Sequence, residues 1–152
     1  MPSEASGLQG EVHPVLRRIY AARGVRSHAE LLLALRDLLP VTTLSGTQPA
    51  AELLYRHRQG SVMVIGDFDA DGATSTALLV RALRSWGFAG VDFLVPNRFE
   101  FGYGLTAEIV ELAARRRPTL IVTVDNGIAS HAGVDAARAA GIEVLITDHH
   151  LP

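Results

Sequence analysis

The pattern of hydrophobic positions along the chain changes at about residue 60. Before that point, leucines between residues 31 and 39 follow Ser27 and Glu30, whose spacing is typical of a capping box, and Pro40 then ends the pattern. A second short helical pattern runs over residues 49–57. We therefore predict a helical amino-terminal segment over residues 1–60, with one helix that begins after Ser27 and continues to Pro40.

From residue 61 onward, short apolar runs alternate with stretches of helical periodicity. Residues 79, 82, 83 and 86, for example, repeat at the spacing of one helix face before Gly87. Such alternation predicts an α/β fold with a mainly parallel sheet, and nearly continuous apolar strands indicate helices on both faces. The expected strands cover residues 62–65, 91–95, 120–124 and 142–146. Residues 61–152 are thus predicted to form a second, α/β domain.

Composition narrows the classes of protein that remain. The chain has 152 residues, of which 48% are hydrophobic and none is cysteine. The absence of cysteine excludes a disulfide scaffold, cysteine-ligated zinc and a cysteine nucleophile. No apolar run approaches the roughly 18 residues of a membrane span, and the polar, acidic amino terminus does not resemble a secretory signal. We therefore expect a cytoplasmic protein that does not enter a membrane.

Acidic and imidazole side chains follow three of the four predicted strands. The carboxyl ends of parallel strands share one edge of the sheet, where ligands bind, so these residues are expected to lie together. Residues 59–152 carry seven arginines against eleven acidic residues, a net charge of −4, so a cation is needed to offset the cluster. The groups are Asp67, Asp69 and Asp71, then Asp125, then Asp148, His149 and His150.

Oxygen ligands together with imidazole suit Mg²⁺ or Mn²⁺, and so many groups would serve a pair of ions of the kind used in phosphoryl chemistry. The alternative is a set of solvated acidic loop ends. Asp67 to Gly72 also matches the start of an EF-hand loop, but the twelfth position is Leu78 and a strand precedes the loop, so a calcium sensor is excluded.

The motifs resemble a known family. Residues 66–72 (GDFDADG), 124–127 (VDNG) and 148–150 (DHH) are similar to the first three motifs of the DHH phosphoesterase superfamily. The stretch 96–105 (PNRFEFGYGL) is similar to its branch of single-strand-specific DNA exonucleases. The resemblance implies a Rossmann-like DHH domain. It also implies that the chain stops before the fourth motif, so we expect an amino-terminal part of a longer enzyme, with carboxyl-terminal domains missing.

The resemblance also implies roles for individual residues. Asp67, Asp69, Asp71, Asp125 and His149 match metal ligands, and Asp125 is the candidate bridging carboxylate. Asp67 would either bind metal directly or orient a ligand or a water molecule. His150 matches a group that contacts the scissile phosphate, and Asp148 would orient an imidazole. Asn97, Arg98 and Tyr103 are candidate substrate contacts. Arg98 is equally explained as part of a surface ion pair, and Tyr103 as a loop anchor.

The implied function is hydrolysis of single-stranded DNA from its 5′ end by water activated with Mn²⁺ or Mg²⁺, in recombination and repair. Single-stranded DNA and other repair proteins are the expected partners, and the chain by itself is expected to cleave weakly or not at all. Two alternatives stay open. One is a DHH-family hydrolase of a small phosphoanhydride or short oligonucleotide. The other is a non-catalytic nucleotide-sensing module.

Overall fold

The structure, a computed structural model, describes residues 12–32 and 34–151. The chain forms two compact units, Met1–Ser45 and Gly46–Pro152. The expected division at residue 60 stays a prediction, although the helix that begins after Gly46 belongs with the second unit. None of the helices within these ranges is long and apolar enough to cross a membrane.

Among its described residues, the amino-terminal unit contains one α-helix, α1 (Pro14–Ala22), and three single-turn 3₁₀ helices, His28–Leu31, Leu35–Asp37 and Val41–Thr43. The predicted continuous helix up to Pro40 is therefore wrong. Its start is correct, because the Glu30 Oε1 atom accepts a hydrogen bond of 3.0 Å from the Ser27 backbone N–H.

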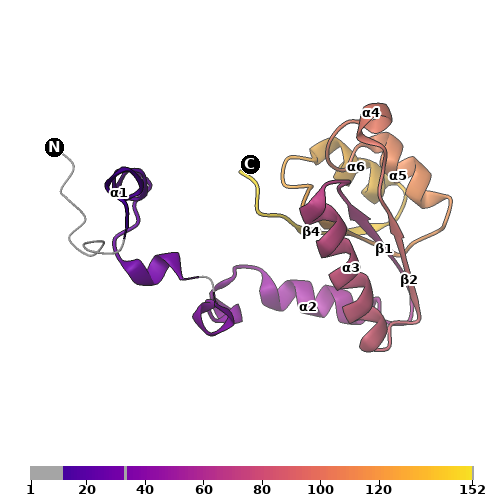
Figure 1. Cartoon of the computed structure of the whole chain (residues 1–152). Coiled ribbons are helices and arrows are strands. Elements are labelled where there is room, and N and C mark those ends of the chain that lie inside the picture. Colours follow the sequence, from indigo (N-terminus) through magenta and orange to yellow (C-terminus); the bar gives the residue numbers. More distant parts are fainter. Residues whose placement is uncertain (1–11, 33, 152) are drawn as a thin grey trace. The chain divides into compact units, whose positions relative to one another are not determined.

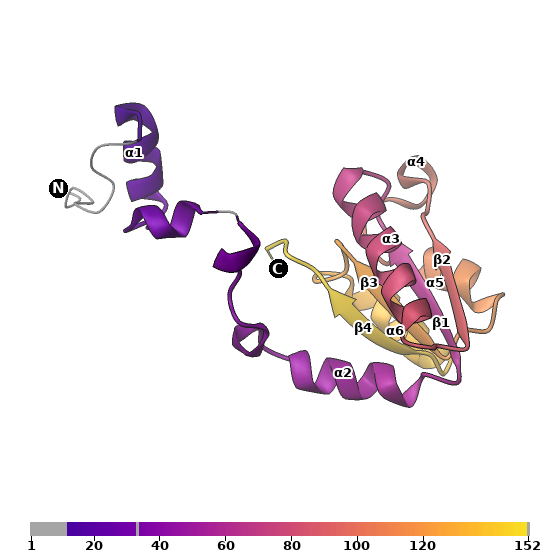
Figure 2. The same ribbon diagram turned by 60° about the horizontal axis from the view of Figure 1, so that its bottom comes forward.

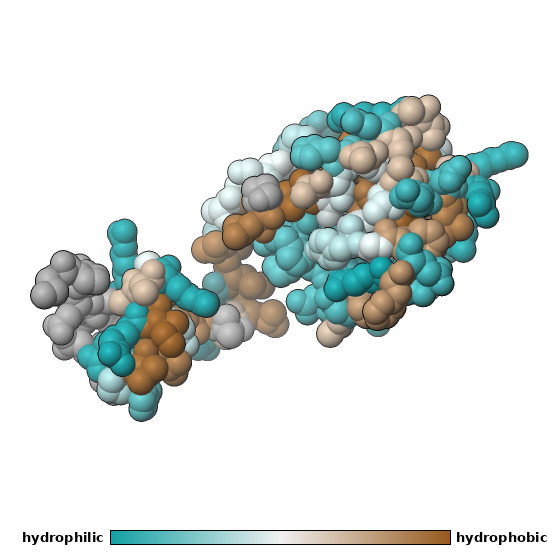
Figure 3. All heavy atoms as spheres, turned by 90° about the horizontal axis from the view of Figure 1, so that it is seen from above, coloured by the Kyte–Doolittle hydropathy of each residue, from teal (hydrophilic) through white to brown (hydrophobic). Residues whose placement is uncertain are grey.

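The predicted helix is interrupted where three of its described leucines lie at the surface. Leu35, Leu38 and Leu39 are 87%, 71% and 81% exposed. A short helix without a packed apolar face is marginal in water, so local turns replace it. Figure 3 shows hydrophobic residues open at the surface of this unit.

The second unit begins with α2 (Thr47–Arg56), close to the predicted helix over residues 49–57. Leu53 and Leu54 pack against the buried core of the sheet. At its end, an Arg56 guanidinium N–H donates to Glu143 Oε1 at 2.9 Å, and the His57 Nε2 atom lies 2.7 Å from Glu143 Oε2. These contacts hold α2 against the amino-terminal end of the sheet.

The sheet has four parallel strands in the order β2-β1-β3-β4. Figure 1 labels β1, β2 and β4 of this sheet. The strands are β1 (Ser61–Gly66), β2 (Gly90–Leu94), β3 (Leu120–Val124) and β4 (Glu143–Thr147). The two central strands, β1 and β3, are buried almost throughout. The predicted α/β fold with a parallel sheet is confirmed.

Helices cover both faces of the sheet, as Figure 2 shows. The helix α3 (Ala70–Ser85) packs on one face through Val80 and Leu83. The other face is covered by α5 (Ala107–Ala114) and α6 (His131–Ala139), and a short helix, α4 (Arg98–Phe101), follows β2. The periodicity of the sequence predicted this arrangement because each helix buries one apolar stripe.

The strand order places a topological switch point between β1 and β3. The chain leaves β1 for β2 on one side, whereas β3 continues to β4 on the other. In open α/β sheets, ligands bind outside the carboxyl ends of the strands at such a point. We therefore expect a ligand site among the residues that follow β1, β3 and β4.

Candidate metal centre

Three strands end in the same row of the sheet. Gly66 of β1 pairs with Val124 of β3, and Val124 pairs with Thr147 of β4. An aspartate follows each of these residues, so the register alone brings three carboxylates to one edge. They are Asp67, Asp125 and Asp148.

Asp125 lies at the centre of this edge in an unusual backbone conformation. Its φ of 62° is in the left-handed region, which a few per cent of non-glycine residues adopt and which aspartate tolerates better than most. The backbone N–H donates to the Thr147 carbonyl at 3.0 Å. The side chain is 6% exposed, and its Oδ1 atom lies 2.8 Å from His149 Nε2.

Asp148 contacts both histidines of its motif, and its expected role of orienting an imidazole stays a prediction. The Asp148 Oδ1 atom lies 2.7 Å from His150 Nδ1 and accepts from the backbone N–H groups of His149 and His150. Burial opposes the charge of Asp148, but these hydrogen bonds and one from the Ile128 N–H outweigh it and lower its pKa. The same carboxylate raises the pKa of His150.

Some of the predicted groups lie around one open hollow, whereas Asp67, Asp69 and His150 are not among the residues that line it. Asp125, His149 and His150 each offer a ligand atom, and these atoms all lie within 4.8 Å of one another. Asp71 and Asp148 line the hollow beside Asp125 and His149. Ser75 also lines it, which the sequence analysis did not predict. Groups from the ends of β1, β3 and β4 thus come together, as the strand pattern predicted.

The first motif places its three aspartates in different surroundings. Asp67, with a side chain 9% exposed, forms an ion pair with Arg98 and accepts from the Phe68 N–H at 2.8 Å. Asp69 is the N-cap of α3 and accepts from the Gly72 N–H at 3.0 Å. Asp71 is exposed in the first turn of α3. Asp71 therefore lines the hollow directly, whereas Asp67 faces Arg98.

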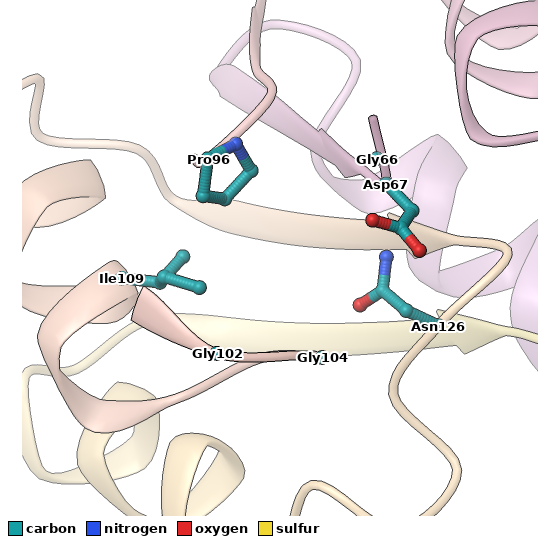
Figure 4. A pocket seen from close by; sticks show the side chains of 7 residues that line it. All are labelled: Gly66, Asp67, Pro96, Gly102, Gly104, Ile109 and Asn126. Carbon is teal, nitrogen blue, oxygen red and sulfur yellow. The ribbon is translucent and has the colours of Figure 1, made fainter. Parts of the chain in front are cut away.

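A second, smaller hollow lies between Asp67 and Asn126 (Figure 4). The Nδ2 atom of Asn126 donates to the carbonyl oxygens of Ile65 at 3.2 Å and Val124 at 2.9 Å. Asn126 is 2% exposed and thereby ties the end of β1 to the end of β3. The sequence analysis did not include Asn126 among the site residues, although its place directly after a strand-end aspartate was a usable signal.

The candidate substrate residues lie on α4 and in the segments directly before and after it, and of the three Arg98 pairs with Asp67. Asn97 is the N-cap of α4 and accepts from the Phe99 N–H at 3.1 Å. The Arg98 guanidinium carbon lies 4.5 Å from the centre of the Phe68 ring and 5.2 Å from that of Tyr103. The Tyr103 hydroxyl donates to the Asp125 carbonyl at 3.2 Å. An ion pair for Arg98 and a loop anchor for Tyr103 are thus both present.

A comparison with protein families matches residues 61–152 to the family described as "DHH family, N-terminal domain". This chain belongs to the DHH family. The matched range begins at the first residue of β1 and includes every strand-end group described above.

Curated proteins that resemble this chain include exonucleases of the same name from different bacteria. The chain is 58% identical over 151 residues to the single-stranded-DNA-specific exonuclease RecJ of Escherichia coli (strain K12), covering 98% of this chain and 26% of that protein. The exonuclease of the same name from Bacillus subtilis (strain 168) is 34% identical over 150 residues, covering 95% of this chain and 19% of that protein. The chain thus spans about a quarter or less of the length of these relatives.

Two solved structures share the DHH fold. A crystal structure of exonuclease RecJ bound to manganese is 42% identical with a TM-score of 0.67, over 80% of this chain and 30% of that one. A crystal structure of RecJ from Thermus thermophilus in complex with Mn²⁺ is 37% identical with a TM-score of 0.62, over 93% of this chain and 20% of that one. Both likenesses agree with the parallel sheet and its helices.

Proposed function

We propose that this chain forms the metal-binding part of a single-strand-specific DNA exonuclease that depends on Mn²⁺ or Mg²⁺. The observation that carries the proposal is the convergence of Asp125, His149 and His150, whose ligand atoms lie within 4.8 Å at the switch point of the sheet. The names of the relatives support the substrate, and the manganese in two related structures supports the metal.

The donor atoms fit the proposed metal. Carboxylate oxygen and imidazole nitrogen together suit Mn²⁺, and a surplus of carboxylates favours a doubly charged cation. Asp125 and His149 would hold one ion together with Asp71, which lines the same hollow. Asp69 and Asp67 would complete a two-metal site, with Asp125 as the shared carboxylate. For this, Asp67 must exchange at least part of its contact with Arg98 for the cation.

Two such ions, when bound, would acidify a water molecule and offset the charge of the phosphate. The residues of the chain supply the rest. Asp148 accepts at His150 Nδ1, which leaves Nε2 as the nitrogen that faces a substrate phosphate. Asp125 is held rigidly, so the ligands need little reorganisation. No side-chain nucleophile is required.

The substrate would be bound by the residues around Arg98. Arg98 can exchange Asp67 for a phosphate oxygen, because a guanidinium binds either anion in the same fork geometry. Tyr103, 48% exposed, offers a ring face for a base, a contact worth about 1–3 kcal/mol. Asn97 would act through the position of α4, which it caps. We further propose that the protein acts in the cytoplasm together with other repair proteins. From the resemblance to the exonuclease family, digestion would start at the 5′ end.

The test uses the natural gene product with Mn²⁺ and five substrates. These are single-stranded DNA labelled at the 5′ end, the same strand labelled at the 3′ end, its duplex, a dinucleotide and pyrophosphate. Early release of labelled mononucleotide from the 5′-labelled single strand alone is the expected result. Preferential cleavage of the dinucleotide or pyrophosphate would refute the proposal in favour of a small-substrate hydrolase. Mn²⁺ binding without hydrolysis of any substrate would indicate a non-catalytic module.

A further inference from the structure

The Tyr103 hydroxyl joins two of the strand ends that form the candidate metal centre. It donates to the Asp125 carbonyl oxygen at 3.2 Å and lies 3.1 Å from the His150 Nδ1 atom. Asp125 follows β3 and His150 follows β4, whereas Tyr103 comes from the loop after α4. One side chain from outside these strands therefore contacts both.

We propose that Tyr103 is a positioning residue, whose hydroxyl holds the left-handed backbone of Asp125 and the ring of His150 in the geometry that metal and phosphate require. This inference rests on the proposed function for its catalytic consequence. It differs from base stacking, which uses the face of the ring and not the hydroxyl.

The backbone of Asp125 needs such support. A non-glycine residue in the left-handed region is strained, and it stays there only where its surroundings determine the conformation. The Asp125 N–H donates to Thr147 on one side of its Cα atom, and the Asp125 carbonyl accepts from Tyr103 on the other. Together these hydrogen bonds restrain both backbone dihedrals and so the direction of the Cα–Cβ bond that carries the carboxylate.

The backbone conformation of the loop that carries Tyr103 holds the hydroxyl in place. Gly102 and Gly104, on either side, have φ values of 76° and 80°, which favour glycine. A Cβ atom on Gly104 would lie 2.8 Å from the Ser130 Oγ atom. That same oxygen accepts from the Leu105 N–H at 3.0 Å, so the loop is fastened to the start of α6.

The experiment compares two variants with the wild-type natural gene product. Tyr103→Phe removes only the hydroxyl, whereas Tyr103→Leu also removes the ring. Tyr55→Phe, at an exposed position of α2, is the matched control. The measurements are the Mn²⁺ dissociation constant from the electron paramagnetic resonance signal of free Mn²⁺, kcat and KM on single-stranded DNA, and Tm without metal.

We expect Y103F to weaken Mn²⁺ binding and lower kcat, each by about 3- to 10-fold, as loss of one hydrogen bond implies. KM should stay within about twofold in Y103F and rise in Y103L, because only the second variant loses a ring that stacks on bases. Tm without metal should fall slightly below that of Y55F, because the hydrogen bond from the hydroxyl to the Asp125 carbonyl is present without metal as well.

Wild-type Mn²⁺ affinity and kcat in Y103F would overturn the inference, and so would a lower Tm with unchanged Mn²⁺ affinity. A different result would refute the proposed function. If the wild-type protein hydrolyses no DNA, that function is refuted, while the Mn²⁺ affinities of Y103F and wild type still decide whether the hydroxyl positions Asp125.

Discussion

The His149 Nε2 atom lies 2.8 Å from the Asp125 Oδ1 atom, although the two residues are 24 positions apart in the chain. They meet because β3 and β4 are neighbours that end in one row, with Val124 opposite Thr147. The histidine is 69% exposed and the carboxylate 6% exposed, so the pair opens on one side only. A cation that approaches from that side meets a buried oxygen and an exposed imidazole together.

Asp125→Asn should therefore remove metal binding while leaving the fold intact. Asparagine tolerates the left-handed backbone as aspartate does, so the conformation at φ 62° is kept. We expect Mn²⁺ affinity and hydrolysis of single-stranded DNA to fall by more than about 100-fold, since even residues that only support metal ligands cost 10- to 100-fold. Calorimetric titration with Mn²⁺ measures the affinity.

Asp135→Asn is the matched control for this substitution, because Asp135 is an aspartate on α6 with a side chain 77% exposed. It should leave both the affinity and the rate unchanged. Wild-type Mn²⁺ affinity in the D125N protein would remove Asp125 from the metal site.

Much of the fold and part of the site follow from local patterns in the sequence. The apolar runs predicted four strands, and the helical periodicity between them predicted both covering layers. Because each polar cluster directly follows a strand, the parallel topology alone sufficed to bring Asp71, Asp125 and His149 to one hollow. Their convergence is thus a consequence of topology and needs no knowledge of individual contacts.

Other features depend on contacts that no local pattern encodes. The leucines before Pro40 have helical spacing, but Leu35, Leu38 and Leu39 are exposed, so a helix there would have an apolar face that is not buried. The partner of the Tyr103 hydroxyl lies 22 positions away and is a backbone carbonyl, which the identity of a residue does not reveal. The ion pair between Arg98 and Asp67 likewise depends on how the loop after β2 folds back over β1.

Asn126→Ala should destabilise the second unit. The substitution removes the side-chain amide N–H groups that donate to the carbonyl oxygens of Ile65 and Val124. Because Asn126 is only 2% exposed, both hydrogen bonds are buried. Leaving buried acceptors without partners costs about 1–3 kcal/mol. Urea denaturation of the natural protein should show this loss.

An exposed amide provides the comparison for this variant. Gln48, on α2, donates to Glu52 at 2.7 Å at the surface, so Gln48→Ala should change the free energy of unfolding by less than about 0.5 kcal/mol. Equal effects of the two substitutions would show that Asn126 does not tie β1 to β3.

Arg98→Gln should make stability more dependent on Mn²⁺. Asp67 is 9% exposed and loses its cationic partner in this variant, which costs about 1–2 kcal/mol because Arg98 itself is 38% exposed. If Asp67 is close enough to the metal to ligate it, Mn²⁺ offsets the unpaired carboxylate. Saturating Mn²⁺ should then raise Tm more in R98Q than in wild type, whereas equal increases would place Asp67 outside the metal site.

Glu143 provides a prediction about pH at the opposite end of the sheet. The hydrogen bond from His57 is the main cause that lowers the pKa of Glu143 below its ordinary value of 4.5. Burial acts in the opposite direction, and Arg56 adds to the lowering. A carboxyl whose pKa is lower in the folded state stabilises the fold above its unfolded-state pKa. That stabilisation is lost as the pH falls through the lower, folded-state pKa.

Wild type should therefore be more stable than Glu143→Gln at pH 6, and the difference should shrink once the pH falls below 4.5. The urea midpoint at pH 6, 5, 4 and 3 measures it, with Glu111→Gln on the exposed face of α5 as the matched control. Because Glu143 contacts both residues at the end of α2, amide hydrogen exchange in α2 should accelerate in E143Q at pH 6. A difference in midpoint that is constant from pH 6 to pH 3 would show that the contacts of Glu143 with His57 and Arg56 do not stabilise the fold.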